Sequence, residues 1–273
     1  MTKEAKRALW VAVAVVAIYG CYNVKSQTRE EANSRAENRD YEIPQIVKQG
    51  VAAQLLERYS YKASYNKRTR TPNWVGWVLT AEHTDGEYAR RGHSFMEDLD
   101  VPLPRAIPAD IRESECGYQR GHMCPAGDNK WSYMAQKDAF LMTNICPQDG
   151  NLNQRGWKYL EEACRDWTKK YGKIYIVAGP IFYSDNYKTV GENMVAVPDA
   201  FFKVVLRIGA TATTTKAIGF IYNNDSSRQA IRECARSVDD VERITGFDFF
   251  TELPDDIENE IEAGFVLADW NIN

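Results

Sequence analysis

The sequence predicts an α+β protein with a mixed, layered core. Two observations favour this class. Strand-like runs rich in β-branched and aromatic residues interleave irregularly with helical segments, and 44% of the 273 residues are hydrophobic, which is enough apolar material for a folded core. The irregular order of the elements argues against a doubly wound sheet, in which strands and helices alternate regularly.

The strand signals lie in four runs, over 74–80, 173–182, 201–208 and 216–222. Several of these runs are apolar at both alternating positions, which is typical of central strands that are covered on both faces. The segment 59–70 is basic and aromatic. It is equally compatible with a strand followed by a solvated basic loop and with the wall of a binding groove.

The clearest helix is predicted over 153–171, followed by Gly172 as a stop signal. Five apolar residues spaced by three and four positions form one stripe there: Trp157, Leu160, Cys164, Trp167 and Tyr171. Further helices are predicted over 227–236 and over 238–245, the second of which ends before Gly246. No internal repeat or Pro-rich tract interrupts the chain, so fibrous and solenoid folds are excluded.

The N-terminal residues differ from the rest of the chain. Lys3, Lys6 and Arg7 precede an apolar run over 8–19, which is typical of a secretory signal and shorter than the roughly 20 residues of a membrane span. Three alternatives remain for residues 1–22: a cleaved signal peptide, a short uncleaved membrane anchor, or lipid attachment at Cys21. We therefore expect an exported protein that is periplasmic, extracellular or tethered to a membrane only through this segment. A mitochondrial presequence is the remaining alternative, and Glu4 argues against it.

The remaining chain divides by composition at one point. Residues 23–40 are polar and charged and are predicted to be a linker, and residues 41–273 are predicted to be one domain. The 34 Lys and Arg against 38 Asp and Glu give a net charge of −4, which excludes a protein that coats nucleic acid through its net charge. None of the six cysteines forms a C-x-x-C pair, which argues against a zinc ribbon.

Residues suited to catalysis gather in the middle of the chain. His122 lies where a strand gives way to a loop and is either a general base or a structural residue of a turn. Asn153 is either the N-cap of the long helix or, through its amide oxygen, a ligand of a hard cation such as Mg²⁺. Glu161 and Arg165, four residues apart, are either a surface ion pair or the edge of an active site. Their spacing alone indicates a hydrolase.

Five segments then follow one another in a recognisable order. They are an Arg-Gly-His core at 120–122 with Pro125 and Asp128, Asn-Ile-Cys-Pro-Gln at 144–148, Leu-Asn-Gln with a later Trp and Leu-Glu at 152–161, Val-Ala-Gly-Pro at 177–180, and a tail at 242–254. In this order and at these intervals they resemble the DNA/RNA non-specific endonucleases of the ββα-metal fold. The resemblance covers residues 41–270 and implies a ββα-metal active-site motif.

The resemblance also implies roles for individual residues. His122 would be the general base that activates water for in-line attack on phosphorus, and Asn153 would be the sole protein ligand of a hydrated Mg²⁺, with Mn²⁺ as the alternative. Glu161 would hold a metal-bound water, and Asn144 would support the catalytic site through hydrogen bonds.

Three arginines would bind the substrate phosphate, because a guanidinium matches phosphate oxygens. They are Arg165, Arg120 and, in the segment 89–93, Arg91 rather than Arg90. One position departs from the family pattern: Gln119 stands where the family usually has Asp before Arg-Gly-His. The neutral amide removes a negative charge close to His122, which disfavours the protonated imidazole.

The resemblance therefore implies a metal-dependent endonuclease that hydrolyses DNA and RNA and leaves 5′-phosphates. A site that grips phosphate and metal reads the backbone and ignores the base sequence. Two alternatives remain. In the first, the chain is a nucleic-acid-binding module on the cell surface whose catalysis is impaired, as the replacement of the family Asp by Gln119 would indicate. In the second, it is an enzyme that cleaves other phosphodiesters.

Overall fold

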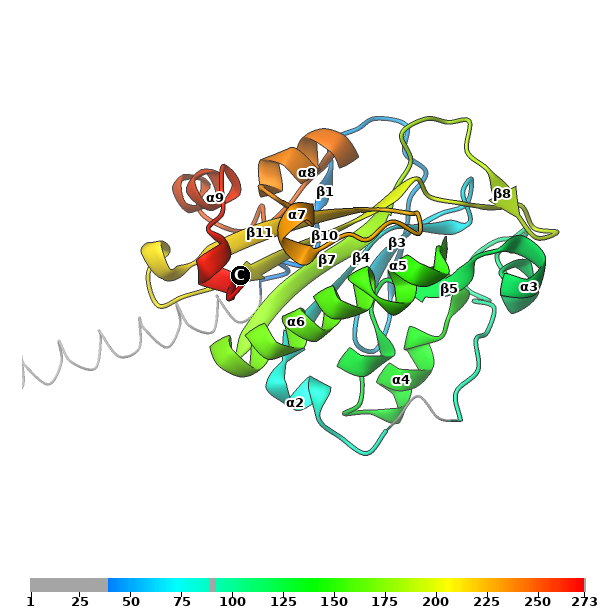
Figure 1. Ribbon diagram of the computed structural model, residues 1–273, viewed down its shortest axis with the longest axis horizontal. Coiled ribbons are helices and arrows are strands. Elements are labelled where there is room, and N and C mark those ends of the chain that lie inside the picture. The colour runs from blue at the N-terminus through cyan, green and yellow to red at the C-terminus, as the bar shows by residue number, and fades with distance from the viewer. Residues whose placement is uncertain (1–38, 89–91, 273) are drawn as a thin grey trace, which may run out of the picture. The chain divides into compact units, whose positions relative to one another are not determined.

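A seven-stranded antiparallel sheet forms the centre of the fold, which we describe from a computed structural model that covers residues 39–88 and 92–272 (Figure 1). Its strands lie in the order β12–β11–β10–β7–β4–β3–β2. They are β2 (Gln54–Glu57), β3 (Lys62–Asn66), β4 (Thr71–Thr80), β7 (Lys173–Ile181), β10 (Ala200–Arg207), β11 (Lys216–Asn223) and β12 (Ala235–Arg236). Residues 41–273 make up one compact unit. The predicted N-terminal segment 1–22, residues 23–38 of the predicted linker, and Arg91 lie outside the described residues.

Helices cover both faces of this sheet. Along β4, Val75, Trp77 and Leu79 pack into one apolar cluster, whereas Trp74 and Val78 pack into another on the opposite face. The first cluster is completed by α6 (Gly156–Tyr171), and the second by α8 (Val238–Thr245) and α9 (Asp255–Glu262). Figure 1 shows α6 on one side of the sheet and α8 and α9 on the other. The predicted layered core, with strands covered on two faces, is confirmed.

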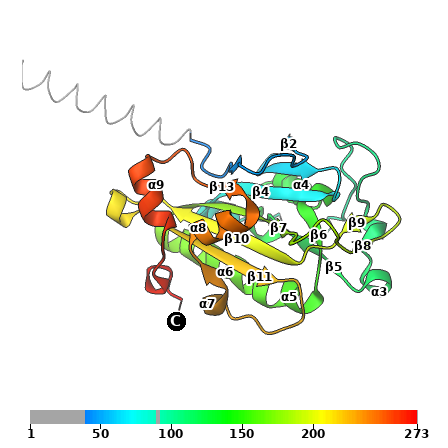
Figure 2. The same cartoon turned by 90° about the horizontal axis from the view of Figure 1, so that it is seen from above.

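Shorter elements surround these layers. The two-stranded sheets pair β5 (Gln119–His122) with β6 (Ile145–Gln148), β1 (Gln45–Ile46) with β13 (Phe247–Asp248), and β8 (Thr189–Val190) with β9 (Val195–Ala196). The remaining α-helices are α2 (Ala81–Thr84), α3 (Glu113–Cys116), α4 (Tyr133–Ala139), α5 (Gly150–Gln154) and α7 (Ile231–Cys234). In Figures 1 and 2, α3, β5 and β8 lie together at one end of the molecule.

The four predicted strands are confirmed as β4, β7, β10 and β11. The predicted single helix over 153–171 is wrong at its start, because Asp149 caps the earlier helix α5 by accepting from the backbone N–H groups of Asn151 and Leu152. The chain breaks at Arg155 (φ −128°, ψ −85°) before α6 begins. Asn153 is therefore an interior residue of α5 and not an N-cap, which leaves its side chain available for other partners.

Local hydrogen bonding and strand pairing determine the extent of the two helices predicted near the C-terminus. The helix predicted over 227–236 shrinks to α7, because Ser227 turns back onto Asp225 and because Ala235 and Arg236 pair with β11. The helix predicted over 238–245 is confirmed as α8, and it ends at Gly246 in the left-handed conformation (φ +73°). The segment 59–70 forms β3 and an adjoining turn, with Tyr61 and Tyr65 buried in the core.

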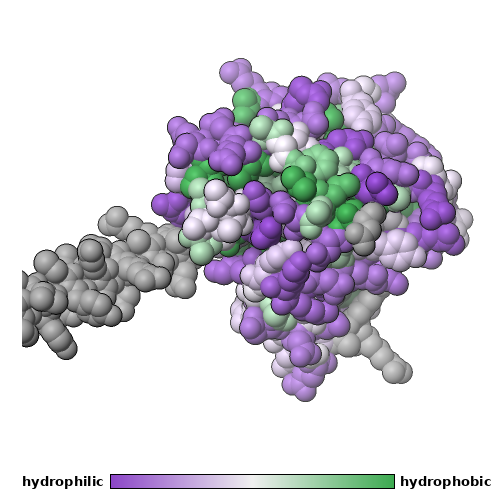
Figure 3. Space-filling view, turned by 60° about the vertical axis from the view of Figure 1, so that its left-hand side comes forward, coloured by the Kyte–Doolittle hydropathy of each residue, from purple (hydrophilic) through white to green (hydrophobic). Residues whose placement is uncertain are grey.

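The face of the molecule drawn in Figure 3 has the polar character that is usual for a folded domain. Figure 3 shows a face that is mostly hydrophilic, with apolar side chains in small separate groups. None of the helices within 39–88 and 92–272 has the length and apolar character needed to cross a membrane. The five cysteines of the described part of the chain are free thiols.

Candidate active site

The candidate active site is assembled where β5 and β6 meet α5 and α6. The two strands are antiparallel, with His122 opposite Ile145, so the imidazole stands at the last position of β5. The indole Nε1 of Trp157, in the first turn of α6, donates a hydrogen bond to the His122 carbonyl at 3.1 Å. This bond ties the end of the strand to the start of the helix, so that two strands and a helix together position the histidine.

These elements border a cleft of about 560 Å³. It brings together five of the seven residues that the sequence predicts for the site: Arg120, His122, Asn153, Glu161 and Arg165. Asn144 lies behind the cleft, where it is completely buried. Nothing is described of Arg91, so its predicted place at the substrate phosphate stays a prediction.

The His122 ring is half-buried between two aromatic side chains. Its centroid lies 5.3 Å from that of Phe95 and 5.2 Å from that of Phe140, and the Phe140 ring meets it edge-on. Rings packed in this way limit the rotation of the imidazole. The histidine is therefore held in one orientation at the cleft, as a general base must be.

A chain of side-chain hydrogen bonds orients Asn153. Gln119 Nε2 donates to Oε1 of Glu113 at 2.9 Å, and Asn153 Nδ2 donates to Oε1 of Gln119, also at 2.9 Å. Because an ionised carboxylate only accepts hydrogen bonds, Glu113 sets the direction of both amides. Asn153 then turns its nitrogen toward Gln119, which leaves its oxygen as the group that can bind a ligand. A side chain at Gly150 would crowd this chain, since a Cβ there would lie 3.1 Å from Gln119 Nε2.

Glu161 extends from α6 into the same cleft and is the only carboxylate among its lining residues. Burial is the main reason that the pKa of Glu161 lies at about 7, well above the ordinary value for a glutamate. Lys203 and Arg165 lower this pKa, whereas Asp128 raises it. Glu161 therefore changes its charge near neutral pH, which is common among residues of active sites.

Arg165 is fixed at the edge of the cleft by a buried carboxylate. Its Nη1 lies 3.0 Å from Oδ1 of Asp128, and the other oxygen of Asp128 accepts from the indole of Trp77 at 3.1 Å. Gly127 gives the guanidinium its space, because a Cβ there would lie 2.9 Å from Arg165 Nη1. The remaining N–H groups of the guanidinium are positioned to meet an anion in the cleft.

Arg120 and Asn144 are held by backbone groups. Arg120 donates through Nε and Nη2 to the carbonyl of Pro108, at 3.2 and 2.7 Å, so only part of its guanidinium faces the cleft. Asn144 donates to the carbonyls of Cys124 and Ala139 and accepts from the Cys124 N–H, all within 2.9 Å. Asn144 thus fixes the loop that follows His122 without reaching the cleft itself.

Two lysines of the cleft were not predicted from the sequence, Lys130 and Lys158. Lys158 had a usable signal, since Lys158, Glu161 and Arg165 recur at helical spacing on α6 and all line the cleft. Lys130 lies in a turn and has no such signal. With Arg120 and Arg165 these lysines give four cationic side chains against the single carboxylate of Glu161. An excess of positive charge in a cleft attracts phosphate groups.

A buried lysine lies beneath the site. Lys203 of β10 has no solvent exposure, and its Nζ has no hydrogen-bond partner among the described residues. The ammonium lies 4.5 Å from the ring centroid of Trp157 and 5.1 Å from that of Trp77. These are the two indoles that bind the His122 carbonyl and Asp128. The sequence signal for this buried cation is a lysine in the middle of the apolar run 201–208.

Comparisons with known proteins agree with this geometry. The family model "DNA/RNA non-specific endonuclease" matches residues 42–256. Nuclease C1 of Cunninghamella echinulata var. echinulata is 39% identical over 226 residues, which cover 77% of this chain and 88% of the relative. The mitochondrial nuclease of Saccharomyces cerevisiae is 31% identical over 240 residues, which cover 80% and 73%.

Human mitochondrial endonuclease G is 39% identical over 164 residues, or 56% of this chain and 54% of the relative. A solved structure described as an EndoG/EndoGI complex matches with a TM-score of 0.69 and 29% sequence identity, covering 77% of this chain and 91% of the other. The α+β class and the ββα arrangement of the site are therefore confirmed.

The predicted export is wrong. Several of the relatives are mitochondrial nucleases, among them those of yeast, human, Danio rerio and Schizosaccharomyces pombe. The prediction relied on a few basic residues before an apolar run. Targeting segments for different destinations share positive charge near apolar residues, so this pattern does not identify the destination.

Proposed function

The chain belongs to the DNA/RNA non-specific endonuclease family, and from this membership we propose how its cleft hydrolyses the phosphodiester backbone of DNA and RNA. The observation that carries the proposal is that His122, Asn153 and Glu161 line one cleft together with four cationic side chains. A general base, an oxygen ligand for a cation and a phosphate-binding surface are the parts that phosphodiester hydrolysis needs.

In this proposal His122 acts as the general base. Its imidazole takes a proton from a water molecule, whose oxygen attacks the phosphorus opposite the 3′-oxygen of the neighbouring nucleotide. The bond between phosphorus and the 3′-oxygen breaks, and the 3′-oxygen takes up a proton from water, which leaves a 3′-hydroxyl and a 5′-phosphate. Packing against Phe95 and Phe140 supports this role, because it keeps the ring in one orientation.

Asn153 would hold Mg²⁺, or Mn²⁺, through its amide oxygen. The donor chemistry fits such an ion, since hard divalent cations prefer oxygen ligands and Mg²⁺ keeps most of its water when few protein groups bind it. The hydrogen bond from Asn153 Nδ2 to Gln119 supports this assignment, because it turns the oxygen away from Gln119. When bound, the ion supplies charge stabilisation for the phosphate and for the leaving oxygen.

Glu161 would orient the hydration shell of the ion from the opposite part of the cleft. Arg165 and Arg120, together with Arg91, would bind the phosphate oxygens. The fixed pair of Arg165 with Asp128 supports the role of Arg165, since a guanidinium held from behind presents its other N–H groups without loss of side-chain entropy. Asn144 would act as a positioning residue for the loop after His122.

Low sequence preference follows from the composition of the cleft. Its polar lining offers cations, three amides, an imidazole and one carboxylate, and we expect these groups to contact phosphate and sugar rather than base edges. We further propose that residues 41–273 constitute the nuclease domain, because they form one compact unit and contain the family match over 42–256.

Plasmid nicking tests the proposal. We expect cleavage in Mg²⁺, no cleavage in EDTA, and loss of nearly all cleavage in His122→Ala. A matched control is His83→Ala, because His83 stacks on Trp131 and does not line the cleft. Wild-type nicking by His122→Ala would reject the catalytic assignment, and DNA that is bound in Mg²⁺ but never cut would favour an impaired binding module.

A further inference from the structure

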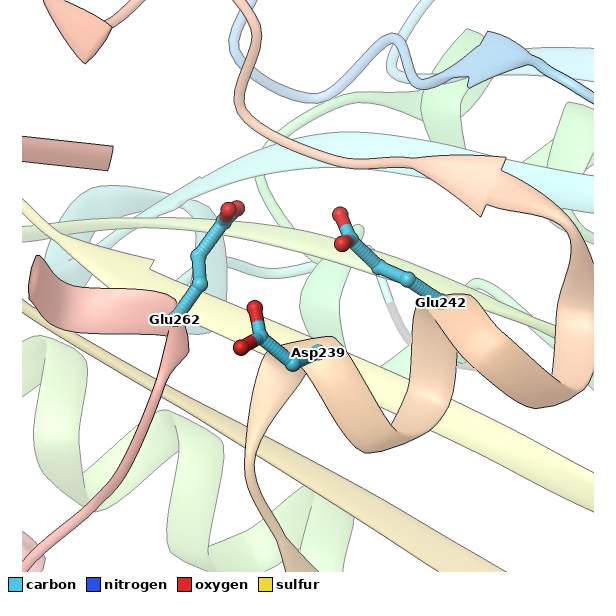
Figure 4. A group of neighbouring side chains, drawn as sticks. All are labelled: Asp239, Glu242 and Glu262. Atoms are coloured by element: carbon cyan, nitrogen blue, oxygen red, sulfur yellow. The ribbon is translucent and has the colours of Figure 1, made fainter. Parts of the chain in front are cut away.

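A second cluster of ionisable side chains lies between α8 and α9. Asp239 and Glu242 come from α8, and Glu262 is the last residue of α9. One carboxylate oxygen of each lies within 4.8 Å of the others, and Figure 4 shows the three groups pointing toward one another. In Figures 1 and 2, α9 and β5 lie at opposite ends of the molecule, so the cluster is separate from the cleft.

Glu262 is the most deeply buried member of this cluster. Its exposed fraction is 5%, and its Oε1 is buried without a hydrogen-bond partner among the described residues. Glu242 differs, because its Oε1 accepts the backbone N–H of Phe249 at 2.8 Å. A buried carboxylate oxygen without a partner is costly, since the water that it loses is replaced by nothing. The position of Glu262 therefore points to a missing positively charged partner.

Among the described residues, helices α8 and α9 offer no protein cation for this role. Helix α9 carries five acidic residues and no basic one, and Arg243, the basic residue of α8, pairs with Asp240 instead. Glu262 also stands at the C-terminal end of α9, where the helix dipole disfavours a negative charge and favours a cation.

We propose that Asp239, Glu242 and Glu262 bind a divalent cation, Ca²⁺, that bridges α8 and α9. Oxygen ligands lie about 2.3–2.6 Å from Ca²⁺, so two ligands on opposite sides of the ion are about 4.6–5.2 Å apart. Three oxygens within 4.8 Å of one another fit this span. Mg²⁺ is usually held by one or two carboxylates, whereas Ca²⁺ takes more oxygen ligands in a flexible geometry, so a set of three carboxylates favours Ca²⁺. Water enters from the side of Asp239, which is exposed, and completes the coordination.

Binding at this position would join two elements that already share a core. Ile257 and Ile261 of α9 pack into the same apolar cluster as Val238 and Val241 of α8. The ion would neutralise the carboxylates that oppose this packing. Because the unfolded chain lacks the site, Ca²⁺ stabilises the folded state in proportion to its occupancy.

Calcium binding and thermal unfolding test the proposal in the full chain with Asn153→Ala, which removes the ligand proposed for the cleft. We expect calorimetry to show one Ca²⁺ bound with a Kd on the order of 10⁻⁴ M, as in sites of few protein ligands. At about ten times this concentration Tm should rise by about 2–4 °C relative to EDTA. Neither readout depends on nuclease activity, so failure here is distinct from failure of the proposed function.

Three substitutions in this background make the test specific. Glu262→Gln and the exposed Asp239→Asn should each abolish the calcium-dependent rise, whereas Glu260→Gln, at an exposed position of the same helix, should keep it. In EDTA, Glu262→Gln should unfold at or above the Tm of its parent, because the amide keeps the shape of the side chain and cannot ionise beside the neighbouring carboxylates. A calcium-independent Tm in the parent, or equal loss in Glu260→Gln, would overturn the proposal.

Discussion

Lys203→Met is expected to move the acid side of the pH–activity profile toward higher pH. Lys203 is the strongest of the groups that lower the pKa of Glu161, and its ammonium is buried beneath the cleft between Trp77 and Trp157. Methionine keeps the length and the apolar stem of the side chain but removes the charge. Glu161 then keeps its proton to a higher pH and loses its function of orienting water around the ion.

The size of the effect follows from the position of the pKa. With a pKa of about 7, Glu161 is ionised in about half of the molecules at pH 7. An opposite charge nearby lowers a carboxyl pKa by about 1–3, and we take ~1 for Lys203 because Arg165 stays in place. After this rise about a tenth of the molecules are ionised at pH 7, so kcat/KM falls about fivefold and recovers by about pH 9.

Initial rates of plasmid nicking between pH 5 and 10, on the order of one measurement per half unit, show the change. Lys173→Met is the matched control, because it removes the same charge at an exposed position of β7. The substitution should have no further effect on the acid limb in a Glu161→Gln background. An unchanged acid limb in folded Lys203→Met would refute the electrostatic link between the buried lysine and Glu161.

Three further predictions concern the supports of the cleft. Gln119→Leu removes the acceptor for Asn153 Nδ2. It should raise the Mg²⁺ concentration that gives half-maximal nicking by about 10–100-fold. An unchanged Mg²⁺ titration would show that Gln119 does not orient Asn153. Asn144→Ala leaves buried backbone groups of Cys124 and Ala139 unpaired. In urea titrations it should lower the free energy of unfolding by ~2–5 kcal/mol. A smaller loss would mean that water takes over the hydrogen bonds of the Asn144 side chain. Lys158→Gln should reduce the slope of log affinity against log salt concentration by about 1. The affinity for DNA is measured by fluorescence anisotropy in the inactive His122→Ala background. A slope equal to that of His122→Ala alone would show that Lys158 does not contact the phosphates.

The sequence pattern predicted the four central strands and helix α6 because those elements are buried. The strands β4, β7, β10 and β11 are apolar on both faces, and the Trp157 stripe of α6 packs on the sheet, so solvent exclusion leaves a clear pattern in the sequence. The break at Arg155 left no such pattern. It depends on Asp149 capping α5, a local hydrogen-bond choice that the apolar spacing of 153–171 does not record.

The contacts that hold the site residues in place could not be predicted from the sequence pattern. The motif around His122 and the spacing of Glu161 and Arg165 pointed to residues that line one cleft. The partners that hold them are far apart in the chain, such as Gln119 for Asn153 and Asp128 for Arg165. Only the tertiary fold brings such pairs together, and Gln119 had been read only as a departure from the family pattern.

The distribution of thiols makes this enzyme suited to site-selective labelling. Cys116 is partly exposed, whereas Cys124, Cys146, Cys164 and Cys234 are buried. Burial raises the pKa of Cys164 to about 12 and that of Cys234 to about 11, so these sulfurs form little of the reactive thiolate. A maleimide dye added to Cys21→Ser protein should therefore attach at Cys116. Because Cys116 shares the short helix α3 with Glu113, the dye would lie at the outer end of the hydrogen-bond chain that reaches Asn153 through Gln119.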